Sequence, residues 1–116
     1  MNEYLLLFRG GETDRKEQTA EQWQAHMYRW VQWMNGLQQQ GLLLGAQPLS
    51  STGKQVTGNR KAVVDGPYVQ AGEAVAGYLM CRAGSYNEAV GIANGCPILE
   101  FENGKVEVRE IQELKM

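Results

Sequence analysis

Hydrophobic and polar positions along the chain predict two strands at the centre of a sheet. Residues 3–9 are apolar on both sides of an extended chain, and residues 75–82 repeat this pattern. Strands with two apolar faces are normally covered on both sides. We therefore expect these two runs to form the middle of the sheet.

A long amphipathic helix is predicted for residues 20–40. Thr19 and Gln22 have the spacing of a capping box, and Gly41 readily adopts the left-handed conformation that ends a helix. At 100° per residue one broad apolar arc forms, which we expect to pack on the sheet. Its members are Trp23, Met27, Trp30, Val31, Met34 and Leu37.

Three further side chains of this helix, His26, Arg29 and Trp33, fall together along one flank of the apolar arc. The flank is the border between core and solvent. We expect these side chains to line a cleft there.

The rest of the chain is predicted to form shorter elements. The Asn103–Gly104 pair is a strong hairpin signal between two strands. The expected elements are a solvated loop at residues 10–18, strands at 42–49, 61–65, 98–102 and 105–111, an edge hairpin that begins at 54–59, and a short helix at 85–94.

This order of elements predicts an α+β fold, a ferredoxin-like split βαβ antiparallel sheet with two helices on one face. Two helices cover only one face of a sheet. The other face would remain apolar, and monomers rarely expose such a surface. We therefore expect a homodimer that forms through the sheet face opposite the helices.

Length and composition narrow the class of protein. The 116 residues fit a single domain, residues 1–116, and the formal net charge of −2 offers no basic surface for nucleic acid. No apolar run approaches the ~20 residues that span a bilayer, and the amino terminus lacks a basic leader, so we expect no membrane association and a cytoplasmic location. Cys81 and Cys96 are expected to stay reduced.

The bend that follows Val64 carries the main candidate for chemistry. Asp65 ends an apolar strand that we expect to be buried, and Gly66 with Pro67 forces the chain to turn directly after it. Two interpretations are open. In the first, Asp65 is a general base or orients His26. In the second, it is a turn aspartate that accepts backbone N–H bonds. Tyr68 either donates a hydrogen bond to a ligand or caps the bend.

Metal and cofactor sites lack support in the sequence. One histidine and two distant cysteines do not form a usual ligand set, and no phosphate-binding glycine loop is present. We expect neither a metal nor a cofactor.

Several segments together resemble one protein family. The strand YLLLFRGG, the helix segment HMYRWVQWM, the turn VVDGPY, the strand AGYLMCRA and the terminal GCPILE and VEVREI resemble, in this order, the YCII-related family, also called the DGPF domain. The resemblance spans essentially the whole chain. Tyr68 stands where the family commonly has phenylalanine.

The resemblance implies a ferredoxin-like fold that dimerises face to face into a dimeric α/β barrel. It implies similarity in fold to small lyases, isomerases and monooxygenases that act on aromatic or lactone substrates. A histidine and an aspartate have been proposed as the family's active pair, which here would be His26 and Asp65. The candidate binding residues come from the helix flank and the bend described above, and they are Arg29, Trp33, Gly66, Pro67 and Tyr68. Relatives are commonly encoded beside sigma factors, which implies a regulatory context.

Two functional hypotheses follow. The first is a cofactor-free enzyme of the lyase or isomerase type, in which His26 and Asp65 move protons on a small, largely apolar or aromatic metabolite. The second is a non-catalytic dimer that binds a ligand or another protein. Convergence of the two side chains on a pocket would favour the enzyme, whereas an Asp65 that is engaged within its own turn would not.

Overall fold

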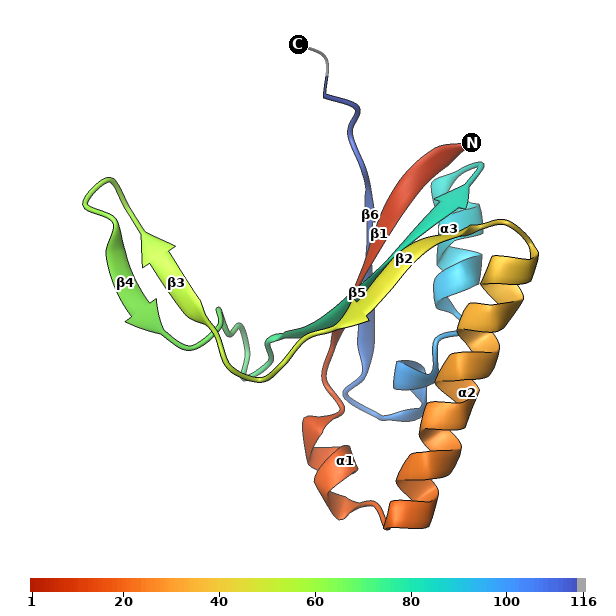
Figure 1. The fold of residues 1–116 in the computed structure, drawn as a ribbon, viewed down its shortest axis with the longest axis horizontal. Helices are drawn as coiled ribbons and strands as arrows, with labels where there is room; N and C mark the ends of the chain where they lie inside the picture. The colour runs from red at the N-terminus through yellow and green to blue at the C-terminus, as the bar shows by residue number, and fades with distance from the viewer. Residues whose placement is uncertain (115–116) are drawn as a thin grey trace.

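The computed structural model describes residues 1–114, and within that range it leaves out the side chains of residues 12–14. Figure 1 shows the arrangement of its elements. The strands are β1 (Asn2–Arg9), β2 (Leu43–Pro48), β3 (Lys54–Thr57), β4 (Ala62–Asp65), β5 (Val75–Ala83) and β6 (Lys105–Glu110). The helices are α1 (Glu12–Glu17), α2 (Ala20–Gln39) and α3 (Tyr86–Ala93), with a 3-10 turn η1 (Pro97–Glu100).

The main sheet has the strand order β2-β5-β1-β6, and every neighbouring pair is antiparallel. The two runs that are apolar on both faces, β1 and β5, lie at its centre, which confirms the prediction from their pattern. Helices α2 and α3 lie on the same side of this sheet (Figure 1). The fold is therefore α+β with a four-stranded antiparallel sheet, and it is compatible with a ferredoxin-like arrangement.

The two faces of the sheet differ in burial. Tyr4, Leu6 and Phe8 of β1 are buried and join the core under the helices. On the other face, Leu5 and Leu7 lie opposite residues of β5 and stay half-buried. The apolar side chains of β1 are thus fully buried on only one of its two faces.

The predicted long helix is present with both of its expected ends. The side chain of Thr19 accepts the backbone N–H of Gln22, whose side chain in turn accepts the N–H of Thr19, so the capping box is formed. Gly41 has φ +73°, the left-handed conformation expected after the helix.

The hairpin of β3 and β4, residues 54–65, forms a separate two-stranded sheet that projects away from the main sheet (Figure 1). We call it the hairpin arm. All four residues of β4 are exposed, so the expectation of a buried strand before Asp65 is wrong. The arm raises the radius of gyration to 15.8 Å, compared with about 13 Å for a compact chain of this length.

The segment predicted to be a solvated loop contains a short helix, α1. Gly11 precedes it with φ +84°, a conformation that lets the chain turn sharply from β1. The helix has too few residues to show an apolar period, so its sequence looked like a loop. It packs instead through Arg15, whose guanidinium carbon lies 4.5 Å from the ring centroid of Trp23.

The predicted hairpin between residues 98–102 and 105–111 is also wrong. The first of these segments is the turn η1 with Pro97 at its start, and β6 pairs with β1. Proline is preorganised for the first position of a helical turn. Gly104 serves close packing, because an added Cβ would lie within 1.8 Å of the carbonyl oxygen of Ile98.

Two further observations concern the chain as a whole. In the described residues, no helix is long and apolar enough to cross a membrane. Cys81 and Cys96 are both free thiols in the buried part of the fold. Burial raises the pKa of Cys96 to about 12 and also raises that of Cys81.

Candidate functional site

His26 lies inside the protein, with 1% of its surface exposed. Its ring packs between the rings of Trp23 and Phe101, at centroid distances of 5.4 Å and 4.6 Å. The expectation of a border position is therefore wrong for this residue. The reason is the segment after η1, whose Phe101 covers a helix flank that would otherwise face solvent.

The two ring nitrogens of His26 have different partners. The indole Nε1–H of Trp30, one turn further along α2, donates to Nε2 over 2.9 Å. An indole N–H can only donate, so Nε2 must carry the lone pair. The proton of the neutral imidazole then lies on Nδ1, which is 3.2 Å from Oε1 of Glu100 and donates to it.

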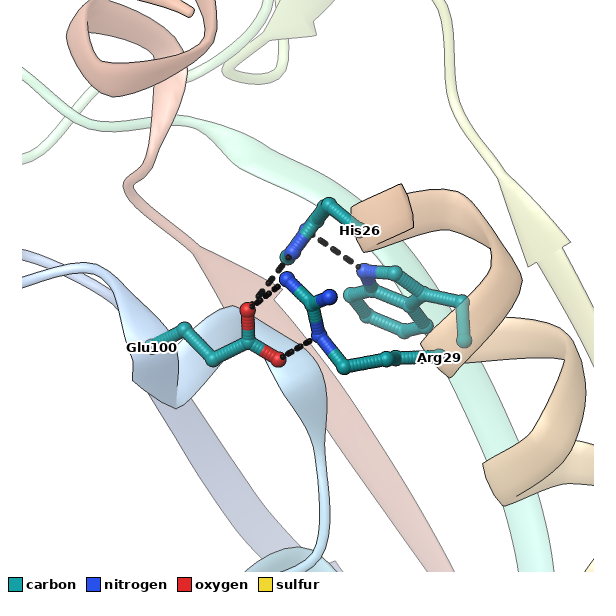
Figure 2. Close-up of polar contacts among 4 residues, drawn as sticks. His26, Arg29 and Glu100 are labelled. Atoms are coloured by element: carbon teal, nitrogen blue, oxygen red, sulfur yellow. Dashed lines mark hydrogen bonds and ion pairs between the residues drawn. The ribbon is translucent and has the colours of Figure 1, made fainter. Parts of the chain in front are cut away.

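Glu100 joins His26 to Arg29 (Figure 2). Nε of Arg29 donates to Oε2 over 2.7 Å, and Nη2 donates to Oε1 over 2.5 Å, which makes a bidentate ion pair. The hydrogen bond from Arg29, followed by that from His26, holds the pKa of Glu100 below its usual range against the opposing effect of burial. His26 and Arg29 thus meet on one carboxylate.

Sequence reasoning missed Glu100. We expected it in a strand, where its side chain would alternate with its neighbours, and no motif marked it as a partner of a histidine. The available signal was Pro97 directly after Cys96, because proline favours the first position of a helical turn. A turn started there places Glu100 at its end, facing α2.

Asp65 lies at the base of the hairpin arm, and its side chain is 87% exposed. It forms an ion pair with Lys54 across the arm, at 2.5 Å. The bend after it has other support, because the N–H of Gly66 donates to the carbonyl of Gly53 and the side chain of Gln55 donates to the carbonyl of Gly66. Gly66 has φ +91°, which explains the glycine at this position.

Within one chain, the two residues of the expected pair form hydrogen bonds with other side chains. Across residues 1–114, the side-chain partner of Asp65 is Lys54, and those of His26 are Glu100 and Trp30.

The remaining candidate residues lie in different surroundings. Tyr68 is 66% exposed, whereas Pro67 lines a cavity. Trp33 donates to the carbonyl of Ile92, packs edge to face on Phe8 and lies partly buried against the core.

A cavity of about 590 Å³ lies next to His26, between α1, α2 and the ends of β1, β2 and β5. Its walls are mostly apolar and aromatic. The large side chains that line it include Phe8, Trp23, Met27, Trp30, Met34 and Phe101. His26 contributes one wall.

The polar groups at this cavity are few. Gln47, Ser50 and Ser51 line it where β2 ends, and Arg15 lines it from α1. Arg15 is the only arginine, lysine, aspartate or glutamate among the described lining residues. No group of three or more potential metal ligands occurs in the described part of the chain. The arrangement is suited to holding a small, largely apolar molecule.

Comparisons with known proteins agree with the resemblance seen in the motifs. Among curated proteins, none matches the chain at a significant level. The profile of the YCII-related domain matches residues 11–115, which is nearly the whole chain and includes the helix of His26, the bend of Asp65 and the turn of Glu100. The chain therefore belongs to the YCII-related family.

Proposed function

We propose that this protein is a non-catalytic homodimer that binds a small, largely apolar metabolite in the cavity beside α2. The observation that carries the proposal is the cavity itself, about 590 Å³ in volume and walled by aromatic side chains. Small-molecule sites commonly have volumes of roughly 300 to 1,000 Å³ and apolar walls with few polar groups.

The hydrogen bonds of His26 favour binding over proton transfer. A general base needs an available lone pair within reach of the substrate. The lone pair on Nε2 is taken by the indole of Trp30, and Nδ1 donates to Glu100. His26 is therefore assigned to the wall of the cavity.

The catalytic pair of His26 and Asp65 stays a prediction for an assembly of two chains. It would require Asp65 from the arm of a second copy and release of Nε2 by Trp30. The exposure of the arm leaves Asp65 accessible to such a contact.

The proposed dimer uses the sheet face that the helices leave uncovered. Leu5 and Leu7 lie opposite Met80 and Tyr78, so four apolar side chains share this face. A second copy would cover them, and a two-fold axis would bring the same residues together from both chains.

The hairpin arm gives further support to a dimer. Val56, Val63 and Val64 are exposed on it. An isolated two-stranded hairpin is at best marginally stable in water. Contact of these valines with a second copy would stabilise the arm.

A thermal-shift screen with small apolar compounds tests the binding function. Compounds that raise the melting temperature of the wild type should lose their effect on Ala46→Phe, which adds a ring to the cavity wall. They should keep it on Val90→Phe, the same kind of change on the exposed side of α3.

Mass spectrometry of the bound compounds decides between binding and catalysis. We expect each compound to be recovered unchanged. A compound that is converted by the wild type, but not by His26→Gln, would replace this proposal with the enzyme hypothesis.

A further inference from the structure

We propose that the ligand of this cavity is a flat apolar molecule that carries one anionic group, and that Arg15 binds this group. The inference rests on the proposed function, because it names the chemical class of ligand for the same cavity. It follows from the charges, the position of Arg15 and the shape of the walls.

The described charges around the cavity favour an anion. Arg15 is a cation, and no carboxylate occurs among the described lining residues. The nearby carboxylate of Glu100 has both of its oxygens engaged by Arg29, and one of them by His26 as well. A ligand with a negative group would therefore meet the positive charge of Arg15. No described carboxylate on the lining would repel it.

The position of Arg15 suits recognition of an oxyanion. Its guanidinium carbon lies 4.5 Å from the centroid of the Trp23 ring, and that ring is itself part of the cavity wall. Packing on an aromatic ring restrains the guanidinium group, while the N–H donors at its edges remain suited to bidentate bonding with a carboxylate. Arg15 forms no ion pair with any described side chain.

The aromatic walls favour a flat molecule. The rings of Phe8 and Trp30 pack edge to face with centroids 5.0 Å apart, so their orientation is fixed by mutual contact. Trp23 extends this surface toward Arg15. A planar ligand that stacks on the face of one of these rings and presents its edge to the other would place a terminal charge near α1.

Helix α1 positions Arg15 at the cavity. The backbone N–H of Arg15 donates to the carbonyl of Gly11 over 3.0 Å, which fixes the helical turn that carries the side chain. Gly11 also lines the cavity. The turn from β1 into α1 therefore places the cation at the edge of an otherwise apolar site.

A matched pair of probes tests the inference. 2-Naphthoate and 2-naphthamide have the same ring and similar size but differ in charge, and their binding can be followed by calorimetry. We expect the wild type to bind the naphthoate about tenfold more tightly, because charge-assisted hydrogen bonds are stronger than neutral ones. High salt should reduce this preference.

Two variants locate the source of the preference. Arg15→Gln should bind both probes with the affinity that the wild type shows for the amide. Lys16→Gln removes the same charge from the next position of α1, which does not line the cavity, and should keep the preference. Melting curves check that both variants are folded.

The outcomes separate this inference from the function on which it rests. If the wild type binds both probes equally, or if Arg15→Gln keeps the preference, the role of Arg15 is overturned while the binding function stands. If neither probe binds and the compound screen also finds no ligand, the proposed function itself fails. The wild-type comparison needs no variant, so it is decisive even if Arg15→Gln does not fold.

Discussion

The indole Nε1–H of Trp30 donates to Nε2 of His26 over 2.9 Å, one helical turn away on α2. This bond fixes the proton of the neutral ring on Nδ1, and the Nδ1–H group donates a hydrogen bond to Glu100. Protonation of Nε2 would set two N–H donors against each other. The histidine that the motifs suggest as a catalyst therefore has both of its ring nitrogens engaged by neighbouring side chains.

Loss of the Glu100 carboxylate should destabilise the protein. Glu100→Ala leaves the buried Nδ1–H of His26 without its acceptor, and an unpaired buried donor costs on the order of 1 to 3 kcal/mol. Urea unfolding at neutral pH measures the loss in free energy of unfolding.

Asp65→Ala is the matched control for that experiment. It removes an exposed carboxylate whose partner is Lys54, and exposed ion pairs contribute at most about 1 kcal/mol. Equal losses for the two variants would contradict the different roles assigned to these carboxylates.

The contribution of Glu100 should depend on pH in one direction. Its pKa is lower in the folded protein than the ordinary value of 4.5, because the carboxylate accepts bonds from Arg29 and His26. Such a group stabilises the fold above its unfolded pKa, and the contribution disappears as the pH falls through the folded pKa. The difference in unfolding free energy between the wild type and Glu100→Gln should be constant near neutral pH and shrink below about 4.5. A difference that persists undiminished in strong acid would show that the charge of Glu100 is not involved.

The dimer should depend on the uncovered sheet face. Leu7→Glu places a carboxylate in the apolar group of this face, directly opposite Glu107 on β6, and should convert a dimer into a monomer at micromolar concentration. Val90→Glu changes an exposed residue on α3 and should leave the dimer intact. Sedimentation velocity distinguishes the two states. A wild type that sediments as a monomer would remove the dimer from the proposal.

Both cysteines should be inert in the folded protein. Burial raises the pKa of Cys81, and that of Cys96 to about 12, so the reactive thiolate is scarce at ordinary pH. A chromogenic disulfide reagent should label neither thiol in the native protein and both in denaturant. Rapid labelling of one thiol under native conditions would show that the fold opens around it.

Much of the fold could be predicted because its elements have long, regular patterns. The apolar runs of β1 and β5 indicated the central strands, and the capping residue Thr19 marked the start of α2. These signals are local, so they can be read from the order of residues alone.

The two misassigned segments, α1 and η1, share one physical cause: short segments take their structure from distant contacts. The helix α1 is too short for a period and is held by Arg15 against Trp23. Turn η1 looked like a strand before an Asn-Gly pair, although Gly104 is required there by close packing against Ile98. Because η1 was misassigned, Glu100 could not be recognised as the partner of His26.

The position of the ring proton on His26 tests the central claim most directly. A long-range proton–nitrogen correlation spectrum reports it without ambiguity of assignment, because His26 is the only histidine. At neutral pH we predict a neutral ring that is protonated at Nδ1 and unprotonated at Nε2, as the bonds to Glu100 and Trp30 require. A ring that is protonated at Nε2, or one that exchanges freely between the two forms, would contradict the account and return His26 to the role of a candidate catalyst.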